Sequence, residues 1–113
     1  MLNHVALTVS DRDRSAEFYG THFGMTDRVH EDEHLLILGG PGRALLALST
    51  GEPPTPLPRT NHFGFLLDDA AAVRAARERF AAAGLEETEW GDAGPARVQV
   101  LDPDGYRVEA YAY

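Results

Sequence analysis

The feature of this sequence that most constrains its fold is a motif that occurs twice. The stretch NHVALTVSD at residues 3–11 returns as NHFGFLLDD at residues 61–69, with Asn-His at the start and an acidic residue at the end. Both copies have the two-residue alternation of a strand, and each is followed by a helix-forming segment and then by shorter strands. The sequence therefore predicts a βαβββ unit that is used twice.

Capping and turn residues mark the limits of the expected elements. Ser10 or Asp11 can cap the first helix, which should end at Gly24, and Asp68 or Asp69 can cap the Ala-rich second helix. The expected helices cover 14–23 and 70–84, and the strands that follow them lie within 25–31, 34–40, 43–50, 85–91, 96–102 and 106–113. A turn at Pro103, Asp104 and Gly105 should form the last hairpin.

The length of 113 residues suits one domain with one core. We expect a single α+β domain with a first module at about 1–50, a proline-rich linker at 51–60 and a second module at about 61–113. The paired βαβββ modules should form a curved, cup-like sheet.

The composition excludes several kinds of partner and site. With 18 acidic and 10 basic residues the net charge is -8, which opposes binding to the phosphates of nucleic acid. No apolar run is long enough to span a membrane and no leader is recognisable, so we expect a cytoplasmic protein. There is no cysteine, so a bound metal would be held by histidine, aspartate or glutamate.

Strand alternation places three potential metal ligands away from the expected core. His4 and His62 occupy equivalent positions in the repeat, and Glu109 is a lone carboxylate in the apolar last strand. If the two sheets curve toward each other, the three side chains converge, and two imidazoles with one carboxylate suit a divalent transition metal with open positions. A histidine at the start of a strand is more often a surface or capping residue, but its repetition favours the metal site.

Other residues are candidates to bind substrate. Tyr111 and Tyr113 share the expected face of Glu109 and could line a pocket with Trp90, while Arg97 could orient the substrate. Glu109 is also the candidate catalytic residue, since it could alternate between metal ligand and base.

The stretches LNHVALTVSD, SAEFY, NHFGF and LDPDGYRVEAY resemble the vicinal oxygen chelate superfamily, also called the glyoxalase, bleomycin-resistance and dioxygenase group. The resemblance covers residues 2–113 and implies paired βαβββ modules around one divalent transition metal (Zn, Ni, Mn, Fe or Co). It implies His4, His62 and Glu109 as the ligands. It also implies a homodimer whose sites are shared between chains.

The resemblance implies a metal-dependent enzyme of isomerase or lyase, thiol transferase or dioxygenase type, acting on a small molecule with adjacent oxygens. The absence of a ligand at Ala47 or Ser49 argues against a standard glyoxalase I, and Ala6 replaces a threonine of the fosfomycin thiol transferases. The alternative is a protein of the bleomycin-resistance type, which binds a drug without catalysis and gives antibiotic resistance. A third reading is a vestigial site in a dimerising domain.

Overall fold

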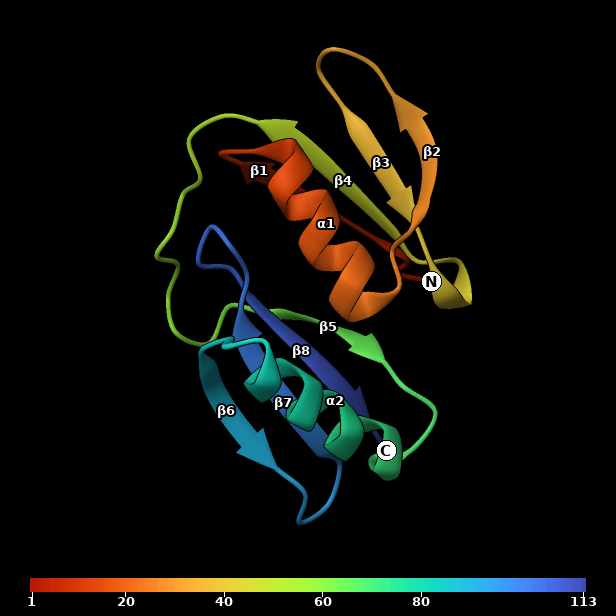
Figure 1. Ribbon diagram of the computed structural model, residues 1–113, viewed down its shortest axis with the longest axis vertical. Coiled ribbons are helices and arrows are strands. Elements are labelled where there is room, and N and C mark those ends of the chain that lie inside the picture. The colour runs from red at the N-terminus through yellow and green to blue at the C-terminus, as the bar shows by residue number, and fades with distance from the viewer. The chain divides into compact units, whose positions relative to one another are not determined.

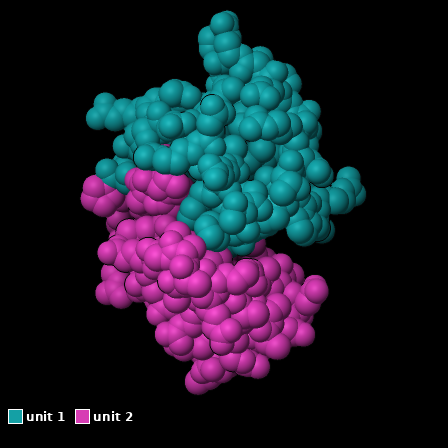
Figure 2. All heavy atoms as spheres, viewed as in Figure 1, with its two compact units in different colours: residues 1–55 teal, residues 56–113 magenta.

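The computed structural model describes all residues from 1 to 113 (Figure 1). The chain forms two compact units, residues 1–55 and residues 56–113, which Figure 2 colours separately. Each unit contains one four-stranded mixed sheet and one α-helix. The predicted α+β class and the repeated βαβββ unit are therefore confirmed.

Unit 1, residues 1–55, has the strand order β1-β4-β3-β2. Strand β1 pairs with β4 in parallel, and the β3 strand pairs antiparallel with both β4 and β2. Its elements are β1 (His4–Val9), α1 (Arg12–Phe23), β2 (Asp27–Glu31), β3 (Leu36–Gly39), the short 3-10 helix η1 (Pro41–Arg43) and β4 (Leu45–Thr50).

Unit 2, residues 56–113, repeats this topology with the order β5-β8-β7-β6. Strand β5 pairs with β8 in parallel, and β7 pairs antiparallel with both β8 and β6. Its elements are β5 (Phe63–Leu66), α2 (Ala70–Ala82), β6 (Glu87–Gly91), β7 (Ala96–Leu101) and β8 (Arg107–Ala112). In both units the first strand thus lies at the sheet edge beside the last strand of its module.

Side-chain caps decide where both helices begin. The carboxylate of Asp11 accepts a hydrogen bond from the backbone N–H of Arg14, and Asp69 does the same for Ala72. Because Asp11 is the cap, α1 begins at Arg12, two residues before the expected start. Helix α1 ends as predicted at Gly24, whose φ of 72° is accessible to glycine without strain.

Each unit has its own apolar core, formed by one face of its sheet and one face of its helix. Alternate strand residues are buried as the sequence pattern predicts, for example Leu7 and Val9 in β1 and Val108 and Ala110 in β8. Full burial of each large apolar side chain stabilises the fold by about 1.5–3 kcal/mol. The largest fully buried residues are Val9, Tyr19, Met25, Leu36, Leu38, Leu46 and Leu48 in unit 1, and Val73, Phe80, Val98, Val100 and Val108 in unit 2.

The turn before β8 is built around a buried carboxylate. Oδ1 of Asp102 accepts hydrogen bonds from the backbone N–H groups of Asp104 and Tyr106, both at 2.9 Å. Gly105 completes the turn with a φ of 89°. The turn predicted at residues 103–105 is present, and it starts β8 at Arg107.

The helices of both units are too short or too polar to cross a lipid bilayer.

We expect the replacement of Asp69 by alanine to lower the free energy of unfolding by about 1 kcal/mol, because α2 loses its cap. Urea denaturation would measure this loss. Asp68→Ala is the matched control, since Asp68 is the exposed neighbour and does not cap the helix. Equal losses in both variants would contradict the assignment of the cap.

The hairpin between β2 and β3 holds a carboxylate with an unusually low pKa. Oδ2 of Asp32 lies 2.8 Å from Nε2 of His30, and its Oδ1 accepts the backbone N–H groups of His34 and Leu35. These contacts, the one with His30 above all, lower the pKa of Asp32 from 3.8 to about 2. Ionised Asp32 therefore stabilises the folded protein above about pH 4, and this stabilisation is lost as the pH falls toward about 2.

Replacement of His30 by alanine should raise the pKa of Asp32 toward its ordinary value, because the largest stabilising contact of the carboxylate is removed. A carbon-detected NMR titration of the Asp32 carboxyl group measures the pKa in both proteins. The same low value in the variant would show that the backbone N–H groups alone set it.

Candidate functional site

The sheet of unit 2 presents one face to α2 and a second face that carries the charged residues. In the strand register Glu109 of β8 pairs with Gly64 of β5 on one side and with Gln99 of β7 on the other. Directly paired residues project to the same side of a sheet. Glu109, Gly64 and Gln99 therefore share a face, which we call the Glu109 face. Val108 and Ala110 lie on the opposite face, which packs against α2.

His62 and Glu109 are brought together on this face. The Nε2 atom of His62 lies 3.5 Å from Oε2 of Glu109, whose side chain is largely buried. His62 immediately precedes β5, and its Nδ1 lies 2.9 Å from the carbonyl oxygen of Thr60. The structure thus pairs two of the three predicted metal ligands.

The hydrogen bond to Thr60 fixes the position of one hydrogen on the His62 ring. A carbonyl oxygen can only accept, so Nδ1 carries the hydrogen, and in the neutral ring Nε2 then presents its lone pair. This lone pair faces a carboxylate oxygen, which is also an acceptor when ionised. Two acceptors that face each other fit a cation between them, and a backbone partner for the second ring nitrogen is typical of metal-binding histidines.

The loop before His62 is held by Arg107 at the start of β8. Its Nη1 donates to the carbonyl oxygens of Leu57 and Pro58, at 3.3 and 3.4 Å. The Pro58 carbonyl also accepts the backbone N–H of Asn61. Sequence reasoning did not identify this role of Arg107, because it depends on a contact between residues about fifty positions apart.

Arg97 is the cation of the Glu109 face. Its Nη1 lies 2.6 Å from Oε1 of Glu89 in β6 and 3.7 Å from Oε1 of Glu109. The hydrogen bond with Glu89 first, and then the charges of both carboxylates, raise the pKa of Arg97, so that the guanidinium stays charged. The predicted substrate-binding residue Arg97 therefore lies beside the predicted ligand Glu109.

Gln99 is a buried polar residue that sequence reasoning missed. It pairs with Glu109 in the register, and its Oε1 accepts a hydrogen bond of 3.0 Å from Oγ1 of Thr88. The available signal was a single glutamine in the apolar stretch ARVQVL. Its hydrogen bond meets the need for a partner that burial creates.

Tyr111 lies over a glycine on the Glu109 face. A Cβ atom added to Gly64 would meet two ring carbons of Tyr111 at 3.1 and 3.2 Å and the carbonyl oxygen of Glu109 at 3.1 Å. The ring also contacts Tyr113 edge to face, with centroids 5.7 Å apart. Gly64 thus makes room for the predicted aromatic wall beside Glu109.

Trp90 is placed elsewhere. It pairs with Val98, which belongs to the buried face of the sheet, and the guanidinium of Arg77 on α2 lies 4.3 Å from the centre of its ring. The structure therefore brings Tyr111 and Tyr113 together but puts Trp90 on the helix side. A bulge between Glu87 and Glu89 shifts the pairing of β6 with β7 by one residue. After the bulge, alternation places Glu89 on the Glu109 face and Trp90 on the helix side.

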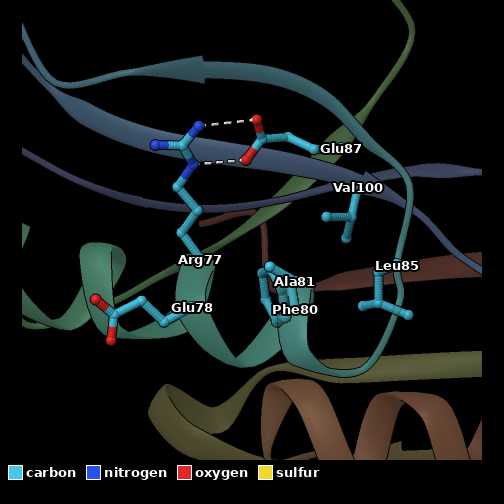
Figure 3. Close-up of a pocket in the computed structure, with 7 residues that line it drawn as sticks. All are labelled: Arg77, Glu78, Phe80, Ala81, Leu85, Glu87 and Val100. Carbon is cyan, nitrogen blue, oxygen red and sulfur yellow. Dashed lines mark hydrogen bonds and ion pairs between the residues drawn. The ribbon is translucent and has the colours of Figure 1, made fainter.

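A groove of about 350 Å³ lies on the helix side of unit 2 (Figure 3). Arg77 and Glu87 form its rim with contacts of 2.7 and 3.1 Å, and the hydrogen bond with Glu87 raises the pKa of Arg77. The lining comes mainly from α2 and from the chain around β6: Arg77, Glu78, Phe80, Ala81, Leu85, Glu87 and Val100. None of these residues belongs to the Glu109 face, so the groove is separate from the His62–Glu109 pair.

His4, the third predicted ligand, is the first residue of β1 in unit 1 and its side chain is exposed. By strand alternation, His4 lies on the face of β1 opposite to the buried residues Leu7 and Val9. His62 lies in the same way opposite to Phe63 and Phe65. Taken singly, neither unit groups three histidine or acidic side chains in a metal-binding arrangement.

The comparison with known families decides the wider identity of the chain. The profile of the Glyoxalase/Bleomycin resistance protein/Dioxygenase superfamily matches residues 1–110. The chain belongs to this superfamily. The match covers both βαβββ units, and the resemblance noted in the sequence is confirmed.

Solved structures of superfamily proteins show the same fold. Lactoylglutathione lyase from Agrobacterium tumefaciens is 27% identical, with a TM-score of 0.78 over 99% of this chain and 92% of that one. The fosfomycin resistance protein FosX from Listeria monocytogenes, in complex with Mn(II) and sulfate, is 19% identical, with a TM-score of 0.83 over 99% and 89%. At that identity the likeness to FosX shows the fold alone. No curated protein matches the sequence significantly.

We expect Gly64→Ala to leave the protein folded but to displace the ring of Tyr111, because the added methyl group lies too close to that ring. The NMR signals of the Tyr111 ring should shift. Gly84→Ala is unsuitable as a control since its φ is positive, whereas Gly91→Ala places its methyl group at ordinary contact distance from Arg97. Unchanged Tyr111 signals in Gly64→Ala would contradict the packing of this ring.

Proposed function

We propose that the protein is a metal-dependent enzyme of this superfamily, in which His4, His62 and Glu109 hold one divalent transition metal. The observation that carries the proposal is the approach of Nε2 of His62 to Oε2 of Glu109, with the ring hydrogen held at Nδ1 by Thr60. His4 is included because it occupies the equivalent position in the repeat. In this proposal the protein is a homodimer and its sites are shared between chains.

The proposed ligand set suits Zn, Ni, Mn, Fe or Co, because imidazole and carboxylate ligands accept all of these ions. The fold relative FosX has been solved with Mn(II), which makes manganese a natural first ion to test. A bound divalent ion would polarise adjacent oxygens of a substrate and stabilise negative charge that develops on them.

The residues around the proposed metal ligands have separate roles. Thr60 holds the His62 ring, and Arg97, which is hydrogen-bonded to Glu89, has further N–H donors that would orient an anionic part of a substrate. Tyr111 supplies an aromatic wall. Glu109 is the proposed proton acceptor, because its carboxylate is largely buried beside His62.

The proposed reaction class is that of an isomerase or lyase, a thiol transferase or a dioxygenase acting on a small molecule with adjacent oxygens. The 27% identity with lactoylglutathione lyase favours the first of these. Ala47 and Ser49 of β4 provide no fourth imidazole or carboxylate, so a standard glyoxalase I site is not our choice.

A second candidate function is the binding of a drug or another small molecule without catalysis. The edge-to-face pair of Tyr111 and Tyr113 favours it, because such a pair can stack on an aromatic ligand without any metal. In that case, removal of metal would leave ligand affinity intact.

We expect the purified protein to retain about one transition metal ion per chain, and His62→Ala, Glu109→Ala and His4→Ala each to lose it, because each removes a ligand. Plasma mass spectrometry of the dialysed proteins measures the content and identifies the ion. His34→Ala is the matched control, since His34 is an exposed histidine on the β2–β3 hairpin. Full metal retention by His62→Ala would refute the proposal, and absence of metal even after reconstitution would favour the binding protein.

A further inference from the structure

Arg97 faces two carboxylates at very different distances. Its Nη1 makes a short contact of 2.6 Å with Glu89 but lies 3.7 Å from Glu109. Only the first distance is within hydrogen-bonding range. The guanidinium is therefore committed to Glu89, although the charge of Glu109 is close enough to attract it.

Glu109 is in turn approached from two sides. Oε1 faces Arg97, and Oε2 faces Nε2 of His62. A guanidinium that binds a carboxylate in the forked geometry takes both of its oxygens. If Arg97 moved fully onto Glu109, both carboxylate oxygens would accept from the guanidinium, and its positive charge would weaken the binding of a cation between Glu109 and His62.

The arrangement on the sheet makes such a move feasible. Glu89 and Glu109 are both paired with Gln99, from opposite sides, so Arg97 on the same strand as Gln99 lies within reach of either carboxylate. The side chains of Arg97 and Glu89 are 38% and 41% exposed, whereas that of Glu109 is only 11% exposed. Arg97 and Glu89 are thus the more exposed side chains, and Glu89 and the largely buried Glu109 compete for the same guanidinium.

From this geometry we infer that Glu89 is a positioning residue that holds Arg97 off Glu109, and so keeps the Glu109 carboxylate free to bind a cation beside His62. The inference rests on the proposed function, because it assigns a role to Glu89 in that site. It adds a residue that does not touch the metal and acts only through Arg97.

The test is a double-mutant cycle on Glu89 and Arg97. Glu89→Gln should release Arg97 to Glu109 and weaken metal binding by about tenfold, the scale of coupling between residues in direct contact. In the background of Arg97→Gln no competitor remains, so the same Glu89→Gln change should have little effect. If Glu89 acted only through its own negative charge, the Glu89→Gln change would weaken metal binding equally in both backgrounds.

Calorimetric titration of Mn²⁺ into the metal-free full-length chain gives the dissociation constant of each variant. Glu87→Gln is the matched control, because Glu87 lies on the same strand but pairs with Arg77 on the helix side. Its affinity for Mn²⁺ should equal that of the wild type. Thermal unfolding of each apoprotein would verify that all the variants are folded.

The outcomes separate this inference from the proposed function. Weaker binding in Glu89→Gln, with the effect abolished in the Arg97→Gln background, supports it. Suppose that the wild type binds Mn²⁺ tightly and that His62→Ala abolishes this binding. If Glu89→Gln then leaves the affinity unchanged, or lowers it equally in both backgrounds, this inference alone would be overturned. A wild-type protein that binds none of Mn²⁺, Zn²⁺, Ni²⁺, Fe²⁺ and Co²⁺ in the same titration would overturn both.

Discussion

The parallel pairing of the first and last strands within each module is the constraint on which the rest of the structure depends. In unit 2, pairing of β5 with β8 sets Phe63 beside Val108 and Gly64 beside Glu109. A shift of one residue would send Glu109 into the apolar face and Val108 out of it. The register is therefore specified by hydrophobic burial, and the position of the carboxylate next to His62 follows from the same register.

The charged residues of the Glu109 face form a chain of contacts from β6 to the loop before β5. Glu89 contacts Arg97, Arg97 approaches Glu109, and Glu109 faces His62, whose ring is held by Thr60. Each carboxylate of the chain thus has a cationic or imidazole neighbour. A largely buried carboxylate such as Glu109 needs neighbours of this kind, because burial of an isolated charge is costly.

The repeated motif was enough to predict the fold class, both helices and the buried side of the first and last strands, because burial follows the strand alternation of residues such as Leu7 and Val108. The pairing of His62 with Glu109 could also be expected from that alternation. The residues that contact the proposed metal ligands could not be predicted in this way. Arg107, Gln99 and Glu89 act through contacts between separate strands, and Trp90 turns to the helix side in a strand whose register is shifted by a bulge. Local sequence does not encode such bulges and long-range contacts.

The separation of the two faces of the sheet has a consequence for how this chain can change over generations. In β8, Val108, Ala110 and Ala112 maintain the core, while the intervening positions carry Glu109 and Tyr111. Substitutions at the second set alter the chemistry offered to a ligand and leave the apolar packing in place. In the proposed function, stability and reactivity thus depend on alternate residues of one strand, so selection can act on either almost independently. A scaffold with this property tolerates substitutions at the outward-facing positions with little loss of folding stability.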